Sequence, residues 1–413
     1  MSVDMVMFKF RYLWIACIFG TMGVALSLVQ AADNAIVLGP IEGELAKKQI
    51  PIDLGRTPKV LVPLISKPIF VHGGLRLSSE KESRFSATFS SAGGNDIQVE
   101  ITRGNPKEPF ASFVSKASTI EGAVSLACDR LVSEILGIPG FFSGRLAFLS
   151  DLSGSKEIFV SDSMMTYSKP QTDFGKMTFN PSWNNDGTGL FFTSNRKVFN
   201  NIYHLDLASR RVATVANYKG SNLRAVQNPR TAQTALILST SGNPELWIAN
   251  TPYERPRRIT NNKSNESGPC WSPDGRRMIL TSDTRGKPQL YEVSLSTGVL
   301  SRIPTNVSSH CVEAAWNPVD PSRIAFTAAV GGGFQIFEYS FTNRASRMIT
   351  RENDHAMQPC WANDGRHIFF TSRSTGGATE IKVIDTEFEE AKPIPLHDRK
   401  FGNCSQPSFL YTR

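Results

Sequence analysis

The stretch PCWSPDGRRMILTS occupies residues 269–282, and a close copy of it, PCWANDGRHIFFTS, occupies residues 359–372. Eight of the fourteen positions are identical, and the strand-like ends exchange one apolar residue for another. The two copies begin 90 residues apart. Recurrence at a fixed distance is the signature of a repeat architecture, so the chain is expected to hold further copies.

Further copies follow one period. Related segments begin at Trp183 (WNNDGTGLFFTS) and Trp316 (WNPVDPSRIAFT), besides those at Trp271 and Trp361. The tryptophans lie 88, 45 and 45 residues apart, and 88 is two periods of 44. The missing copy is found, degenerate and without its Trp, at residues 226–241. A period of about 40–45 residues is typical of a β-propeller with one four-stranded blade per repeat.

Each repeat can be divided into four strands. A short first strand ends near the Trp, and a turn such as Asn-Asp-Gly follows, where Gly can adopt positive φ and Asp caps the turn. The second strand is apolar, as expected for a strand buried between blades. The predicted third strands are residues 202–207, 246–250, 290–295, 336–341 and 381–386, and the predicted last strands include 212–216 and 300–305. We expect the Trp to fill the space between neighbouring blades.

The two ends of the repeat region complete one blade. Residues 144–150 resemble a second strand that lacks its Trp turn, and residues 406–409 (QPSF) resemble a first strand with nothing after it. If the C-terminal strand joins the first blade, the ring closes and two sheet edges are covered. The predicted fold is therefore mainly β, with a six-bladed β-propeller over residues 141–413.

Residues 32–140 lack the repeat and are predicted to form a small α/β domain. Residues 59–64 (KVLVPL) and 97–102 (IQVEIT) are predicted strands. Ser118 and Glu121 form a capping-box pattern that opens a helix. Apolar residues recur on one face of that helix, and Gly137 is predicted to end it.

The N-terminus has the pattern of a secretory signal peptide over residues 1–31. Lys9 and Arg11 precede an apolar run over residues 12–29, which ends in small residues. A transmembrane anchor is the rival interpretation, because the run approaches the ~20 residues that span a bilayer. No second run of this kind occurs, so the mature chain is predicted to be exported, soluble and without an integral membrane segment.

Charge and cysteines exclude some classes of protein. The net charge is +8, and removing Asp4, Lys9 and Arg11 with the signal peptide leaves +7. The basic residues are spread along the chain, so no nucleic-acid partner is predicted. Five cysteines remain in the mature chain, an odd number that permits no complete disulfide framework. Their spacing matches no zinc site. A single disulfide bridge between neighbouring repeats is left as an alternative. The five cysteines are Cys128, Cys270, Cys311, Cys360 and Cys404.

These features together resemble the TolB family, the periplasmic components of the Tol-Pal system. The resemblance rests on the signal peptide, on DRLVSEILGIPGFFSGRLAFLSD at residues 129–151, and on six blades with a degenerate PxWSPDG theme. It covers residues 129–413 well and residues 33–120 weakly. It implies a non-enzymatic periplasmic adaptor without cofactor or metal. In that family the propeller mouth binds a Pal-type peptidoglycan-associated lipoprotein, and the N-terminal region contacts a TolA-like inner-membrane protein, in support of envelope integrity and cell division.

Strand direction locates the predicted mouth. The first strand of each blade runs from one opening to the Asp-Gly turn, and the second strand returns to the same opening. Residues five or six before each Trp, and residues just after the Thr-Ser pair, therefore encircle that opening. The predicted partner-binding residues are Asn195, Arg196, Asn265, Glu266, Asp283, Arg285, His310, His355 and Arg373. His310 and His355 occupy the same register, which resembles a Pal-contacting position of the family.

Two other functions stay open. A metal-dependent polysaccharide lyase would use His310 and His355 with a carboxylate such as Glu266 or Glu313. A serine hydrolase is not indicated, because the sequence lacks the Gly-x-Ser-x-Gly motif. The other hypothesis is that the propeller is only structural and that the N-terminal domain makes the contacts with partners.

Overall fold

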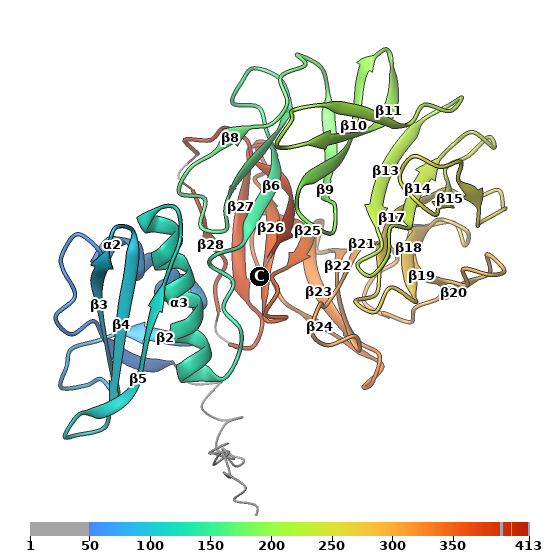
Figure 1. The fold of residues 1–413 in the computed structure, drawn as a ribbon. Coiled ribbons are helices and arrows are strands. Elements are labelled where there is room, and N and C mark those ends of the chain that lie inside the picture. The colour runs from blue at the N-terminus through green and yellow to red at the C-terminus, as the bar shows by residue number, and fades with distance from the viewer. Residues whose placement is uncertain (1–48, 389–390, 398, 412–413) are drawn as a thin grey trace, which may run out of the picture. The chain divides into compact units, whose positions relative to one another are not determined.

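The computed structural model describes residues 49–388, 391–397 and 399–411, and the predicted signal peptide lies outside these ranges. Within them the strands form one five-stranded sheet and six four-stranded sheets (Figure 1). The predicted fold class, a six-bladed β-propeller preceded by a small α/β domain, is confirmed.

The α/β domain is built on the sheet order β2-β1-β3-β4-β5. Its strands are β1 (Ile50–Asp53), β2 (Leu75–Leu77), β3 (Phe85–Gly93), β4 (Asp96–Arg103) and β5 (Glu108–Ser115), and its helices are α2 (Val62–His72) and α3 (Ile120–Leu136). Alternate residues of β3 and β4 are buried, so this sheet has one apolar face. The apolar side of α3 packs on it, with Val124 and Leu131 fully buried.

The prediction of a strand at residues 59–64 is wrong, because the helix α2 begins there. Leu61, Ile65 and Ile69 are buried and recur at helical spacing. Pro63 lies in the first turn of α2, where its missing N–H leaves no hydrogen bond unmade. The apolar run that suggested a strand is thus the buried face of a helix.

The helix α3 was predicted correctly, but its cap differs. Thr119, not Ser118, is the N-cap, and its Oγ1 accepts a hydrogen bond from the Gly122 N–H at 3.1 Å. Gly137 ends the helix in the left-handed conformation, as the sequence predicts.

The six blades each contain four antiparallel strands. The first consists of β29 (Ser405–Leu410), β6 (Arg145–Ser150), β7 (Glu157–Asp162) and β8 (Lys169–Pro170), the second of β9 (Thr178–Trp183), β10 (Gly189–Lys197), β11 (Phe199–Asp206) and β12 (Val212–Ala216), and the third of β13 (Asn222–Gln227), β14 (Thr234–Leu238), β15 (Glu245–Ala249) and β16 (Arg257–Arg258). The fourth consists of β17 (Glu266–Trp271), β18 (Met278–Ser282), β19 (Gln289–Val293) and β20 (Leu300–Arg302), the fifth of β21 (Cys311–Trp316), β22 (Arg323–Val330), β23 (Gly333–Ser340) and β24 (Ala345–Met348), and the sixth of β25 (His355–Trp361), β26 (His367–Arg373), β27 (Thr379–Asp385) and β28 (Ile394–Pro395).

The C-terminal strand closes the ring. Strand β29 pairs antiparallel with β6, and Phe409 lies opposite Leu146. The first strands of successive blades contact one another around the ring, in the order β9, β13, β17, β21, β25, β29 and again β9. These first strands therefore surround a central channel.

The repeated Trp joins adjacent blades, as predicted. Trp183, for example, is buried in a cluster with Ala147 and Leu149 of the first blade. The indole N–H groups of three tryptophans donate to a carbonyl on the first strand of the preceding blade. These bonds are Trp183 Nε1 to Ser408 at 2.9 Å, Trp271 Nε1 to Val226 at 3.1 Å and Trp361 Nε1 to Ala315 at 3.1 Å. The Trp thus supplies both apolar contact area and a directed hydrogen bond between blades.

The cysteines in the described residues are all free thiols. Two of them serve the blade contacts. Cys270 Sγ accepts the Trp316 N–H at 3.2 Å, and Cys360 Sγ accepts the Phe409 N–H at 3.2 Å. Burial raises the pKa of the Cys360 thiol to about 11, so it stays protonated and unreactive at neutral pH.

Candidate binding site at the propeller mouth and channel

The strand register brings the predicted residues to one end of the blades, which we call the mouth. His355 lies opposite Arg373 where β25 begins and β26 ends, and Glu266 lies opposite Ser282 at the same point of the fourth blade. Asn265 donates from its backbone N and its Nδ2 to the two carboxylate oxygens of Asp283, both at 2.8 Å. The geometry expected from strand direction is therefore present.

Two predicted histidines flank a phenylalanine that the sequence reasoning missed. The ring of Phe334 lies 5.6 Å from that of His310 and 5.8 Å from that of His355. The Phe334 N–H also donates to His355 Nδ1 at 3.2 Å. All three residues are half-buried. The signal in the sequence was an aromatic residue directly after the Gly-Gly-Gly tip of the fifth blade.

Arg196 lies on aromatic rings at the second blade. Its guanidinium is 4.1 Å from the ring centre of Phe174 and 5.4 Å from that of Tyr203. Exposed apolar side chains lie beside it in the sequence, with Val198 81% and Phe199 71% exposed. Cationic and apolar groups side by side are typical of a protein-binding surface.

Glu266 differs from its prediction as a contact residue. It is 1% exposed, and its carboxylate accepts hydrogen bonds from Thr260, Asn262 and Ser282 at 3.0–3.1 Å. Burial raises the pKa of this carboxyl. Glu266 therefore holds the loop before β17 in place and is not available to a partner.

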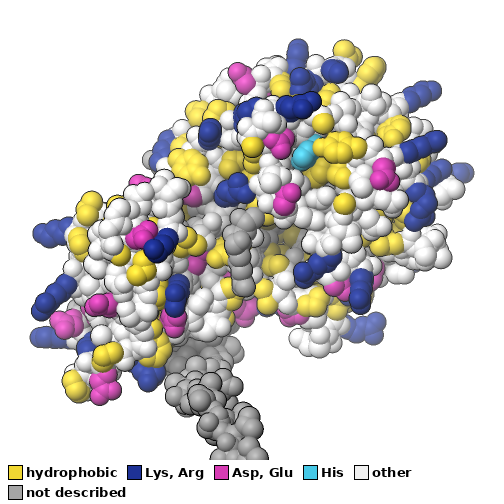
Figure 2. All heavy atoms as spheres, in the orientation of Figure 1, with side chains coloured by type: hydrophobic (Ala, Val, Ile, Leu, Met, Phe, Trp, Pro, Cys, Tyr) yellow, Lys and Arg dark blue, Asp and Glu magenta, His cyan; other side chains and the backbone are white. Residues whose placement is uncertain are grey.

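Basic residues outnumber acidic ones in the loops at the mouth. In the described residues these loops carry nine Lys or Arg, which are Lys156, Lys176, Lys219, Lys263, Arg285, Lys287, Arg351, Arg399 and Lys400. They carry five acidic residues, which are Asp151, Asp173, Asp283, Glu352 and Asp354. The excess of positive charge favours an acidic partner at this end. On the face that Figure 2 shows, charges of both signs are interspersed.

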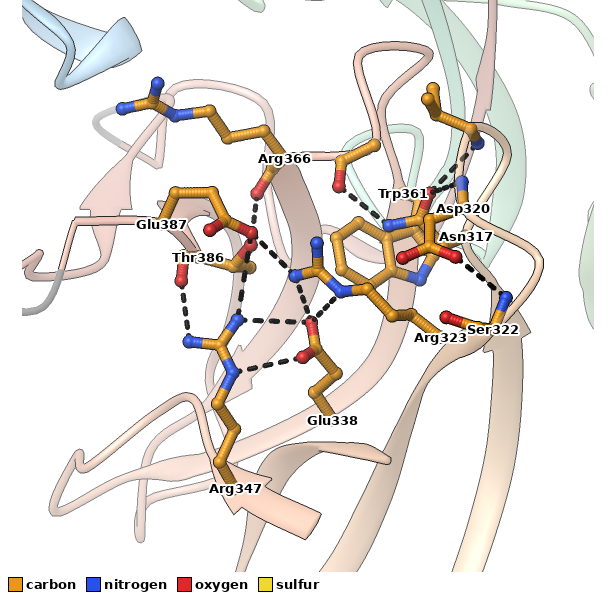
Figure 3. Close-up of polar contacts among 12 residues, drawn as sticks. Asn317, Asp320, Ser322, Arg323, Glu338, Arg347, Trp361, Arg366, Thr386 and Glu387 are labelled. Carbon is orange, nitrogen blue, oxygen red and sulfur yellow. Dashed lines mark hydrogen bonds and ion pairs between the residues drawn. The ribbon is translucent and has the colours of Figure 1, made fainter. Parts of the chain in front are cut away.

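The opposite end of the blades holds an ion-pair network. Between the fifth and sixth blades, Arg323 and Arg347 both pair with Glu338, at 2.5 Å and 3.0 Å, and Arg323 also pairs with Glu387 at 2.7 Å (Figure 3). The Arg323 guanidinium lies 5.6 Å from the ring centre of Trp361. This network joins the fifth and sixth blades.

A ring of six residues lines the central channel, each three positions before the Trp of its blade or the equivalent residue. They are Asn180, Arg224, Gly268, Glu313, Gln358 and Gln406, and they surround a cavity of about 80 Å³. Five of them adopt positive φ, between 54° and 58°, at an irregularity in the first strand. The sequence carried only a weak signal for this ring, because Gln alone occurs twice at this register and the other four residues all differ.

The repeated Thr of the second strand secures this ring. Thr371 Oγ1 accepts the Gln406 N–H at 2.9 Å, and Thr281 Oγ1 accepts the Glu313 N–H at 3.3 Å. In each case the Thr belongs to the preceding blade. The Thr thus binds an N–H that the strand irregularity leaves without a ladder partner.

One group of three side chains has the composition of a metal site. Ligand atoms of His72, Asp364 and His367 lie within 4.8 Å of one another, and all three residues are buried. Both ring nitrogens of His367 are occupied, however, by Asp364 Oδ2 at 2.6 Å and by the backbone O of His72 at 2.8 Å. We therefore interpret the group as the hydrogen-bonded junction between α2 and the sixth blade.

The predicted lyase ligands do not form a comparable group in the described part of the chain. That group of three includes none of His310, His355, Glu266 and Glu313. Glu313 Oε2 accepts from Thr327 Oγ1 at 2.8 Å, and Glu266 is buried in its own hydrogen bonds.

Comparison with known proteins adds family relationships to this geometry. The family described as "TolB beta propeller domain" matches residues 132–312. The Tol-Pal system protein TolB of Francisella tularensis subsp. tularensis is 26% identical over 334 residues, which cover 76% of this chain and 75% of that protein. The corresponding protein of Bordetella pertussis is 28% identical over 171 residues, which cover 41% of this chain and 39% of that protein. The chain is thus similar to TolB proteins, over about three quarters of its length in the Francisella comparison.

A solved member has the same fold. The crystal structure of TolB from Acinetobacter baumannii superposes with a TM-score of 0.76 at 17% identity, and covers 88% of this chain and 96% of that one. At this identity the likeness concerns the fold alone. Neither helix in the described ranges is long and apolar enough to cross a membrane.

Proposed function

We propose that this chain is a TolB-type periplasmic adaptor of a Tol-Pal-like system, and that its mouth binds a Pal-type lipoprotein. The observation that carries the proposal is the composition of the mouth, where an excess of Lys and Arg surrounds exposed apolar side chains and the His310–Phe334–His355 cluster. Such a surface suits an acidic protein partner with an apolar centre.

The proposed contact residues are those of the predicted set that lie at the mouth with side chains open to a partner. They are Asn195, Arg196, Asn265, Asp283, Arg285, His310, His355 and Arg373, and Phe334 joins them. Aromatic and Arg side chains near the centre of an interface commonly carry most of its binding energy. We therefore expect Phe334 and Arg196 to contribute more than the Asn side chains.

The adaptor has a second contact in this proposal. The N-terminal region, part of which lies before the described residues, would bind a TolA-like inner-membrane protein, and the chain would so link inner and outer membranes. Export by a cleaved signal peptide belongs to the same proposal. The lyase alternative gains no support, because its ligands are not brought together.

The test is capture of the partner from an envelope extract. The mature chain, immobilised, is expected to retain a peptidoglycan-associated lipoprotein identified by mass spectrometry. The double variant His310→Ala/His355→Ala is expected to lose it, while His204→Ala, which changes the same residue type away from the mouth, retains it. Retention by the double variant would move the contact to the N-terminal domain, and the absence of any lipoprotein would contradict the proposal.

A further inference from the structure

We propose that the central channel is a binding site for a carboxylate group, and that Arg224 is the residue that binds it. This inference goes beyond the adaptor function, since it concerns the inside of the ring and not its rim. The ligand is a small carboxylate, either free in solution or presented by an Asp or Glu side chain of a protein seated on the mouth.

Arg224 is the cation of the channel ring. It belongs to β13 and lines the cavity with Asn180, Glu313, Gln358 and Gln406. Within the described residues its Nε is buried and has no hydrogen-bond partner, and its guanidinium joins no ion pair. Other arginines of the blades, such as Arg323, are paired with carboxylates.

An unpaired guanidinium in such a place needs an explanation. Removing a cation from water is costly unless a counter-charge or hydrogen-bond acceptors replace the water. Burial lowers the pKa of Arg224, which reflects that cost. The counter-charge or hydrogen-bond acceptors that would offset this desolvation cost must come from the cavity.

Two of the three neighbouring side-chain amides, those of Gln406 and Gln358, present donors, whereas Asn180 donates its Nδ2 to the Leu223 backbone O at 2.9 Å and keeps its Oδ1 as an acceptor. Gln406 Oε1 accepts the Asn180 N–H at 2.7 Å, and Gln358 Oε1 accepts the Thr371 hydroxyl at 2.8 Å. These two bonds fix the carbonyl end of each amide, so the Nε2 groups are left to donate. A guanidinium with two amide donors on one cavity matches the acceptor oxygens of a carboxylate.

Glu313 is the acidic residue of the ring, and it is already engaged. Its Oε2 accepts from Thr327 Oγ1 at 2.8 Å and from the Gln358 N–H at 3.0 Å. It makes no ion pair within 4.0 Å with Arg224, although its charge favours the protonated guanidinium. Water between Arg224 and Glu313 is the competing explanation, and the experiment separates the two.

The size of the cavity limits the ligand. About 80 Å³ holds several water molecules, which is room enough for one carboxylate group. A planar guanidinium binds a carboxylate with two parallel hydrogen bonds, which lysine cannot do. Formate is therefore the probe of choice.

The first experiment measures thermal unfolding of the mature chain in sodium formate and in sodium chloride at equal ionic strength. For the unaltered chain, Tm is expected to rise with formate until the site is saturated, because a ligand of the folded state stabilises it. Arg224→Gln is expected to lose this rise completely, and Arg224→Lys, which keeps the charge, to show a smaller one. Arg276→Gln, an exposed arginine beside the Asp-Gly turn, is the matched control and should respond like the unaltered chain.

The second experiment tests a carboxylate supplied by a partner, and this arm rests on the proposed function. If formate has no effect, Arg224→Gln should still weaken binding of the captured lipoprotein by about tenfold, with Arg276→Gln unchanged. An equal formate response in Arg224→Gln and the unaltered chain overturns the proposal. So does the absence of both effects. If no lipoprotein is captured, the adaptor function fails and the formate experiment alone decides the channel site. A lower Tm for Arg224→Gln, with no formate response in either protein and no weaker lipoprotein binding, supports the water-bridged pair and rejects the carboxylate site.

Discussion

At Gly140 the segment between α3 and β6 passes directly against the helix. A Cβ at this position would lie 2.4 Å from both Cα and Oδ1 of Asp129. Asp129 is fixed in turn, because its carboxylate accepts the N–H groups of Phe142 at 2.6 Å and Ser143 at 3.0 Å. The junction therefore cannot move aside for an added methyl group.

Gly140→Ala is expected to lower the free energy of unfolding by ~1–3 kcal/mol, the usual cost of overpacking. The measurement is chemical denaturation followed by circular dichroism. Gly376→Ala is the control, because a Cβ there meets only Ser374 Oγ at 3.9 Å and the backbone needs no left-handed conformation. Equal stability of the two variants would show that the junction is not closely packed.

His72 makes the stability of the chain depend on pH. Burial, with His367 and Arg366 nearby, lowers the pKa of His72 from 6.5 to about 3. Between these values the unfolded chain binds a proton that the folded chain does not. Stability is therefore lost as pH falls below about 6.5. His367 acts in the opposite sense. Although its burial opposes the charge, Asp364 raises its pKa, so its contribution is complete below 6.5 and is lost as pH rises.

The expected result is a smaller acid sensitivity in His72→Asn. The Asn side chain can still accept the Gly74 N–H that His72 Nδ1 accepts at 3.3 Å, but it takes up no proton. From pH 7 to pH 5, the unfolding free energy should fall by about 2 kcal/mol less in the variant than in the unaltered chain, from ~1.36 kcal/mol per pKa unit. Parallel pH profiles of the two proteins would place the sensitivity elsewhere, since Arg366, Asp364 and Asp385 also face this ring.

At the scale of the strand, Thr371 holds the closing element. Its hydroxyl donates to Gln358 Oε1 and accepts the Gln406 N–H of β29. Thr371→Val keeps the shape but leaves that part-buried N–H without a partner, which costs ~1–3 kcal/mol. Hydrogen exchange of residues 405–410 is expected to accelerate. Thr342→Val, in an exposed turn, is the control and should change neither hydrogen exchange nor stability. Unchanged exchange in Thr371→Val would show that the Thr371 hydroxyl does not hold β29 in place.

Elements that repeat were predictable from the sequence, and those that do not were less so. The Trp period placed the blades, and even the degenerate copy formed β13 and β14, because period and apolar strands were kept. The run at residues 59–64 misled, since a short apolar run fits either a strand or a helix. The mouth followed from strand direction, but burial of Glu266 depends on side-chain partners that periodicity does not specify.

The channel ring shows the same limit more clearly. Positive φ at Gln358 and Gln406 follows from an irregularity that the pattern of apolar residues does not reveal. Phe334 reaches the histidines only through the length of the β22–β23 hairpin. The Trp contacts between blades were predictable, but these polar and aromatic contacts needed the folded ring before they could be recognised.

At the scale of the whole molecule, closure of the ring brings the first and last strands of the propeller, β6 and β29, into one blade. Strand β29 lies between β6, with which it pairs, and the first strands of both neighbouring blades. Phe409 stacks on Phe369 of the sixth blade at 5.3 Å between ring centres. Removal of residues 405–413 therefore exposes the edge of β6 and opens an apolar site that a strand can refill.

We expect a chain that ends at Cys404 to unfold at a lower temperature, and a synthetic peptide of residues 405–413 to restore part of the loss. The peptide can add the missing strand to β6 by backbone pairing, while Phe409 gives the register its specificity. The measurement is Tm at increasing peptide concentration, because a ligand of the folded state raises Tm in proportion to its binding. A peptide with Phe409→Ser should restore less, since it lacks the contact with Phe369. If the shortened chain melts at the same temperature as the intact one, pairing of β29 with β6 does not hold the ring closed, and a mouth assembled from six blades would not depend on it.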